Sequence, residues 1–201
     1  MLTTSLSAPA AEVKRPTILA IDVLAATDPE PVNWDPARCK LAVAAVIPIV
    51  DGQVRMDLRY TYTERYLPEL RRRLQQADIV ICWNAEFDIG LIFGGRPPRN
   101  LRVIDLFQVV SDLAGYRVPL WVATRDTLGR RLAWSRDAHE LWAAGRFRDV
   151  GRIAIDHARA VAELVAMAEA GEPIMADGRG WQWEPGEFLG FGVAEEATAI
   201  A

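Results

Sequence analysis

Three aspartates have the residue type and the setting for metal-dependent chemistry. Asp22 lies inside an apolar run, and Asp88 lies just beyond another. Asp156 lies within a long amphipathic stretch, one position off its apolar stripe. Carboxylates are rarely buried unless they are paired or bound to a metal. If the three converge, two Mg²⁺ or Mn²⁺ ions about 4 Å apart can neutralise them and activate water for phosphodiester hydrolysis.

Each aspartate also has a structural explanation. Asp22 can be a turn residue at a strand end, Asp88 a charge at a helix N-terminus, and Asp156 a salt-bridge partner. The spacing alone does not decide between these explanations and a metal site. The metal-site hypothesis therefore requires that all three side chains face one cleft.

The elements that position these aspartates are predicted from hydrophobic periodicity. The predicted strands cover 17–26, 40–50, 53–63 and 78–85, and the segment 100–115 begins as a strand and continues as a helix. The predicted helices cover 64–77, 87–95, 125–133, 135–145 and 146–171, with Asp126 opening the third. The Asp51-Gly52 turn makes a hairpin of the second and third strands. A hairpin followed by crossovers predicts an α/β fold, with a mixed sheet covered by helices on both faces.

The length and composition indicate one globular domain with small appendages. The chain has 201 residues, of which 51% are hydrophobic and 25% charged, so it can bury a sizeable core. We expect a flexible N-terminal tail over 1–16, the main domain over 17–170, and a C-terminal hairpin or tail over 171–201. In that last segment, Trp181 and Trp183 suit either a hairpin appended to the domain or a tail that binds a partner.

The charge and the content of cysteine and histidine exclude several functions. The formal net charge of −4 argues against binding of polyanions by bulk charge, so a nucleic-acid contact requires a local basic patch or a metal ion. Two isolated cysteines, Cys39 and Cys82, and two histidines lack the spacing of a metal site. No run approaches the ~18 apolar residues of a membrane span. We expect a cytoplasmic protein without a membrane partner.

The order of the motifs resembles a known family. IDVLA lies where the DEDD superfamily of ribonuclease-H-like 3′–5′ exonucleases has D-x-E, and WNAEFD is similar to its second motif. The matching segments, in order, are 21–25, 83–88, 101–120, 125–134 and 153–164. The resemblance is greatest to the predicted bacterial YprB-like branch, and it covers residues 17 to about 185. It implies a ribonuclease-H-like fold.

The resemblance also implies roles for individual residues. Asp22, Asp88 and Asp156 would be the catalytic residues and would bind Mg²⁺ or Mn²⁺. Asn84 would orient the site or contact the terminal nucleotide of a DNA or RNA 3′ end, and Phe87 would pack beneath it. In a second layer, Asp105 would support the site, with a purely structural role as the alternative.

Two positions depart from the family pattern. Leu24 replaces the glutamate of D-x-E, and Arg152 replaces a tyrosine four residues before the last aspartate. Arg152 and Asp156 are i, i+4 neighbours on a helix and can pair. If Arg152 points inward, the site is two charge units less negative than the family site, which weakens binding of Mg²⁺. The nearby carboxylates that can substitute are those of Asp28, Glu30 and Glu86.

Two hypotheses of different classes follow. One is a metal-dependent 3′–5′ exonuclease whose activity is weakened by its altered site. The other is a non-catalytic ribonuclease-H-like module that binds nucleic acid or a protein partner, with no metal bound. The tryptophans are expected to pack in or around the core, with base stacking as the alternative; these are Trp83, Trp121, Trp134 and Trp142. His157, on the apolar stripe, is expected to be a packed histidine.

Overall fold

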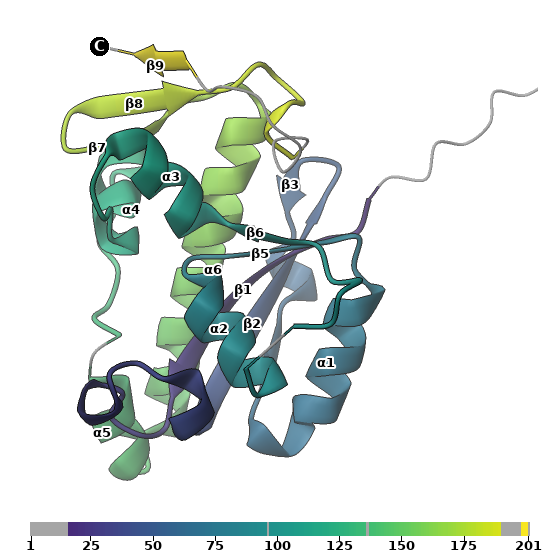
Figure 1. Ribbon diagram of the computed structural model, residues 1–201, viewed down its shortest axis with the longest axis vertical. Coiled ribbons are helices and arrows are strands. Elements are labelled where there is room, and N and C mark those ends of the chain that lie inside the picture. Colours follow the sequence, from purple (N-terminus) through teal and green to yellow (C-terminus); the bar gives the residue numbers. More distant parts are fainter. Residues whose placement is uncertain (1–15, 96, 136, 190–197, 201) are drawn as a thin grey trace, which may run out of the picture.

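A mixed six-stranded sheet forms the centre of the molecule in the computed structural model, which describes residues 16–95, 97–135, 137–189 and 198–200 (Figure 1). The strand order is β3-β2-β1-β5-β6, and β4 also pairs with β2. The strands are β1 (Ile18–Ala25), β2 (Leu41–Val50), β3 (Gln53–Val54), β4 (Tyr60–Tyr62), β5 (Ile79–Cys82) and β6 (Val103–Asp105). β2 runs antiparallel to β1, whereas β5 and β6 run parallel to it.

The apolar runs of the sequence become the buried centre of this sheet. All eight residues of β1 and nine of the ten residues of β2 are buried. Side chains of β1 alternate between two hydrophobic clusters, with Ile21 and Val23 in one and Ala20 and Leu24 in the other. Because side chains alternate along a strand, Asp22 shares the face of Ala20 and Leu24.

Helices cover both faces of the sheet, which confirms the predicted fold class. α1 (Leu67–Gln76) and α2 (Ala85–Phe93) pack on one face, and α6 (Phe147–Glu169) crosses the other (Figure 1). Three further helices, α3 (Leu106–Ala114), α4 (Leu120–Leu128) and α5 (Ala138–Ala143), add residues to the cluster of α6. Asp22 therefore lies on the face of the sheet that α6 covers.

Two predicted elements differ from the structure. The strand predicted over 53–63 is divided into β3 and β4 by a 3₁₀ turn, Met56–Leu58. The helix predicted over 125–133 is α4, which begins earlier, with Pro119 as its N-cap, and ends at Gly129, whose φ of +65° terminates the helix. Asp126 is thus an interior residue, and its carboxylate binds Arg125 and the backbone N–H of Asp177.

The C-terminal segment forms a small second sheet. β7 (Ile174–Ala176) and β8 (Arg179–Gln182) make a hairpin, and β9 (Thr198–Ile200) pairs with β8. Trp181 and Trp183 are buried, and the Trp183 ring contacts Phe188 edge to face at 4.9 Å. Residues 1–15 of the predicted tail lie outside the described residues. Within the described part of the chain, no helix is long and apolar enough to cross a membrane.

Candidate functional site

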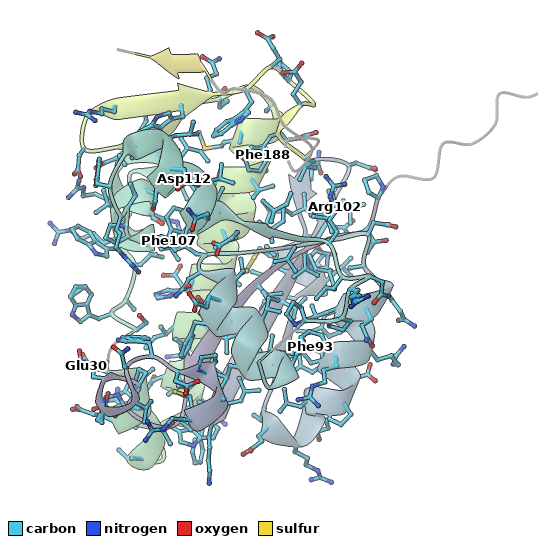
Figure 2. All side chains as sticks on the ribbon, in the orientation of Figure 1. Glu30, Phe93, Arg102, Phe107, Asp112 and Phe188 are labelled. Carbon is cyan, nitrogen blue, oxygen red and sulfur yellow. The ribbon has the colours of Figure 1, made fainter. Side chains whose placement is uncertain are left out.

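A cleft of about 550 Å³ opens where the carboxyl ends of β1 and β5 meet the start of α2. Its walls come from the loop after β1, from the α3–α4 connection, from residues 132–135, and from α5 and α6. Glu30, in the loop after β1, and Phe107, in the first turn of α3, both line the cleft and are labelled in Figure 2. Ends of parallel strands at a point where the strand order changes direction are a common position for a ligand site.

The floor of the cleft holds a buried aspartate–histidine pair. Asp22 and His157 are both buried, and the Nδ1 atom of His157 lies 3.6 Å from Oδ1 of Asp22. The other ring nitrogen of His157 lies 2.8 Å from the carbonyl oxygen of Ala133, which orients the ring. Burial by itself lowers the pKa of His157, but the charge of Asp22 and its hydrogen bond raise it above the ordinary value. Burial also raises the pKa of Asp22, and His157 counteracts part of that shift.

Asp88 is the second carboxylate of the floor. It lies in the first turn of α2 and is buried. Burial, together with the charges of Asp22 and Asp105, raises its pKa well above the ordinary value. One oxygen of each floor carboxylate, Oδ2 of Asp22 and Oδ2 of Asp88, is buried without a hydrogen-bond partner among the described residues. Because such groups are costly to bury unpaired, the floor is arranged for a proton, a cation or a ligand donor.

Asp105 supports the turn that carries Asn84. Its carboxylate accepts hydrogen bonds from the backbone N–H groups of Asn84 at 3.0 Å and Ala85 at 2.8 Å. It also caps α3 by accepting from the N–H of Phe107 at 3.1 Å. Asp105 therefore fixes the start of α2 to the start of α3.

Asn84 is held in a strained conformation at the edge of the cleft. Its backbone is left-handed, with φ of 88° and ψ of 71°, which asparagine tolerates better than most residues. Its side chain makes no hydrogen bond to another described residue and lines the cleft. This placement leaves the amide available to a ligand, as the predicted role requires.

An aromatic pair covers the floor from the side of the early loop. Phe87 is buried in α2, and the Trp34 ring meets it edge to face at a centroid distance of 5.5 Å. The loop approaches α2 closely because Gly90 has no side chain, since a Cβ there would lie 2.6 Å from Cγ of Pro36. Phe87 thus packs at the cleft wall.

Exposed tryptophans form the rim of the cleft. Trp34, Trp121 and Trp134 are 46%, 42% and 57% exposed, although large aromatic side chains are normally well buried. The Trp121 and Trp134 rings contact each other edge to face at 6.5 Å. Trp83 lies deeper and is buried. As expected, Trp83 packs in the core, and Trp121 and Trp134 pack at the rim. The rings at the rim leave wide aromatic faces open.

Asp156 has different contacts from the other two aspartates, and its role as a metal ligand stays a prediction. Asp156 is not among the residues that line the cleft. Its carboxylate binds Nη1 of Arg130 at 2.6 Å, and Arg130 also binds Glu163 at 2.9 Å. The residue of α6 that faces Asp22 is His157, one position further along the helix. Each helical residue turns about 100° from the one before, so one position decides which side chain reaches the cleft.

The expected pairing of Arg152 with Asp156 does not form either. Arg152 is on the outer side of α6, its side chain is 80% exposed, and it lies 3.6 Å from Asp149. It therefore adds no charge to the floor of the cleft. Leu24 is buried in the core, and of the substitute carboxylates Asp28 and Glu30 line the cleft.

The donor set does not fit two Mg²⁺ ions. Among the described residues, no group of three or more carboxylate, histidine or cysteine side chains is arranged to hold a metal ion. The cleft floor offers two carboxylates and an imidazole, whereas Mg²⁺ prefers oxygen ligands in octahedral geometry. Asp156, which the family pattern makes a ligand, is neutralised by Arg130.

His157 is the residue that the sequence did not point to as part of the site. The signal was its polar side chain within the otherwise apolar stripe of α6, which includes Ile153, Val161 and Leu164. A buried polar group needs a partner, and Asp22 on β1, the strand against which this part of α6 packs, provides one.

The sheet order and the helices on both faces define a ribonuclease-H-like fold, of the kind found in 3′–5′ exonuclease domains. The family B DNA polymerase from the archaeon Pyrobaculum calidifontis is similar, with a TM-score of 0.52 and 16% identity, over 77% of this chain and 24% of that chain. Escherichia coli Exonuclease I, solved with an oligonucleotide, gives a TM-score of 0.46 and 14% identity, over 77% of this chain and 40% of that chain. The chain thus spans less than half the length of either protein.

Comparisons of the sequence add no further relatives. The chain matches no protein-family model and no curated protein. At identities below one fifth, the structural similarity concerns the fold, and function has to be argued from the site.

Proposed function

We propose that this protein binds the 3′ ends of single-stranded DNA or RNA in the cleft, as a ribonuclease-H-like module that does not use two-metal hydrolysis. The observation that carries the proposal is the exposed tryptophan rim over a floor with only two carboxylates. Unpaired bases stack on aromatic faces, and each stacked base contributes about 1–3 kcal/mol. A volume of about 550 Å³ suits one or two nucleotides better than a duplex. The motif order, which resembles the YprB-like exonucleases, supports the 3′ end as the part that enters.

Other residues of the cleft support the same ligand. Arg117 lines the cleft and lies over the Phe107 ring at 4.9 Å, where its guanidinium can meet a phosphate. Asn84 offers an amide to a terminal hydroxyl or a base edge. Oδ2 of Asp22 can accept a hydrogen bond from a terminal hydroxyl, which would satisfy an unpaired oxygen of the floor.

The test is binding of linear and circular single strands of equal length and sequence. We expect quenching of tryptophan fluorescence and tighter binding by the linear strand, because a circle has no 3′ end to insert. Trp121→Ala and Trp134→Ala should each weaken binding by about 5- to 100-fold, which corresponds to one lost stacking contact. Equal affinity for circle and line would refute recognition of an end.

A matched control separates stacking in the cleft from a general loss of surface aromatics. Tyr60 is 42% exposed and lies outside the cleft. Tyr60→Ala should leave binding unchanged. If it weakens binding as much as Trp134→Ala, the rim has no special role.

A second candidate function is a weak cation-dependent 3′–5′ exonuclease activity. The observation in its favour is the pair of buried, unpartnered oxygens of Asp22 and Asp88, which suit one divalent cation such as Mn²⁺. The test is release of nucleotides from 3′-labelled strands with Mg²⁺ or Mn²⁺ at high protein concentration. Activity that Asp88→Ala abolishes would establish it. If the wild-type protein releases no nucleotides, this second candidate function is wrong and binding remains the proposed function.

A further inference from the structure

A second cavity, of about 800 Å³, lies between the edge of the sheet and the first turns of α6. We call it the basic groove. Its walls are formed by the start of β2, by β4 with the turn that follows it, and by one side of α5 and α6. The lining residues used below are Lys40, Arg65, Trp142, Phe147, Arg148 and Arg152, with Gly151 between the last two.

The groove concentrates positive charge in a chain that is acidic overall. Four cationic side chains line it, against one carboxylate, that of Glu64. In the described part of the chain, Lys40 and Arg148 make no ion pair, and Arg152 has only a loose contact with Asp149 at 3.6 Å. Cations left without partners around a hollow attract an anionic ligand. The groove therefore supplies a local basic patch of the kind by which an acidic protein can bind nucleic acid.

An aromatic pair accompanies these cations. Phe147 is 55% exposed, and its ring meets the ring of Trp142 edge to face at 4.6 Å. Phosphates on cations and bases on aromatic faces are the two contacts by which proteins hold single strands. An acidic peptide would use the cations but would gain less from an open phenylalanine.

The linings of the basic groove and the cleft include neighbouring residues at two places in the chain. Ala25 lines the cleft and Ala26, the next residue, lines the groove. On α5, His139 lines the cleft, whereas Trp142, one helical turn later, lines the groove. A nucleic-acid strand whose end lies in the cleft would pass these residues to reach the groove.

We propose that the basic groove binds the sugar-phosphate backbone of single-stranded nucleic acid, and that it holds the nucleotides preceding the 3′ end. The second half of this statement rests on the proposed function of the cleft. The first half does not, since the charge and the aromatic pair belong to the groove alone.

The test compares a dinucleotide with a 5′-labelled dodecanucleotide by fluorescence anisotropy at several salt concentrations. The double variant Arg148→Gln/Arg152→Gln should weaken binding of the long strand about tenfold or more and leave the dinucleotide unaffected. Loss of two phosphate contacts should reduce the slope of log K against log salt concentration by about 1.4. Phe147→Ala should weaken the long strand about tenfold, without a change in slope.

Two further variants guard against trivial explanations. Arg99 and Arg179 line neither cavity, so Arg99→Gln/Arg179→Gln removes the same charge elsewhere and should have little effect on affinity. Gly151→Leu keeps all charges. Apart from its chain neighbours and the nearby backbone of the helix itself, no atom lies within 4 Å of the added Cβ, so the fold should tolerate it while the side chain fills the groove. It should weaken the long strand as the double variant does.

The outcomes separate the groove from the cleft. The proposal for the groove is wrong if the control pair weakens binding as much as the groove pair does. It is also wrong if the groove variants have no effect on binding. If linear and circular strands bind equally and the groove variants still weaken both, the cleft proposal fails and the groove stands. If the wild-type protein binds no single strand at about 50 mM salt, both are wrong.

Discussion

Asp156 and His157 are neighbours in the chain but belong to two different regions of the molecule. Asp156 lies on the side of α6 that carries an ion-pair network. Arg130 binds Asp156 and Glu163 there, and Arg159 binds Glu163 at 2.7 Å. His157 lies on the buried side, against Asp22 at the cleft floor. A turn of about 100° along the helix separates a charge-balanced surface from an incomplete buried site.

The difference between the two regions lies in how far each satisfies its own polar groups. In the ion-pair network, every carboxylate has a guanidinium partner. At the cleft floor, His157 lies against Asp22, and Asp22 and Asp88 each keep a buried oxygen without a partner among the described residues. Buried groups left unsatisfied in this way cost stability, and they are retained where a ligand completes them. The floor therefore has the character of a binding site and the network that of a structural surface.

The largest expected loss of stability comes from replacing His157 at the cleft floor. His157→Ala leaves the Asp22 carboxylate buried without its partner, and we expect it to lower the free energy of unfolding by about 3–4 kcal/mol. Urea denaturation measures this loss. The control is Asp156→Ala on the neighbouring position, for which we expect about 1 kcal/mol. Equal losses would show that the two regions do not differ.

The pair of His157 and Asp22 also predicts a dependence of stability on pH. The pKa of His157 is raised in the folded protein, so its contribution to stability is complete below the unfolded pKa of about 6.5 and is lost as the pH rises through the folded pKa. The wild-type protein should therefore lose stability over this interval, and His157→Gln should not. A wild-type stability that stays constant across the interval would contradict the pair.

Asp105→Ala should have the next largest effect, because Asp105 holds the cleft in place. The variant removes the acceptor of the N–H groups of Asn84, Ala85 and Phe107, which should cost about 2–3 kcal/mol. Asp112→Ala on the same helix α3 is the control, since Asp112 is exposed and, among the described residues, accepts a hydrogen bond from Gln108 alone. Thermal unfolding distinguishes them. A similar Tm for both variants would mean that the Asp105 bonds contribute little.

The fold could be predicted from the sequence where burial of apolar side chains alone determined the structure. β1, β2 and β5 are continuous apolar runs, and full burial on both faces requires that pattern. The prediction failed over 53–63, because the alternating pattern there does not reveal a 3₁₀ turn that divides the strand. For α4, the fixed φ of Pro119 and the left-handed Gly129 set the ends, and the aspartate at 126 was a misleading cap signal.

The site could be predicted in part. The stretch WNAEFD carries Asn84, Phe87 and Asp88 on one short turn, so local geometry alone brings them to one place. The α6 residue could not be chosen in the same way. It depends on the rotation of a long helix against β1, which is set by packing of many apolar side chains and not by any motif.

Asp88→Asn tests the difference between the cleft floor and the ion-pair network in the opposite direction, because we expect it to stabilise the protein. Burial raises the folded pKa of Asp88, so its carboxylate increasingly destabilises the fold as the pH rises from the unfolded value of 3.8 through the folded pKa. Asparagine mimics the protonated form, and we expect a gain of about 1–2 kcal/mol at neutral pH. The gain should vanish in acid. Asp156→Asn, which loses an ion pair, should give no gain at any pH.

The smallest expected effect tests the ion-pair network through its central residue. Arg130→Gln leaves Asp156 and Glu163 without a shared cation, but both are partly exposed and Glu163 keeps Arg159, so we expect a loss of only about 1 kcal/mol. Arg152→Gln, at a largely exposed position, should cost close to nothing. Arg130→Gln should not alter binding of single strands to the cleft, whereas Arg152 lines the basic groove and serves here as a control for stability alone. If Arg130→Gln weakens binding of single strands as much as His157→Ala does, Asp156 contributes to the cleft after all. Freeing its carboxylate from Arg130 would then change the affinity for the ligand.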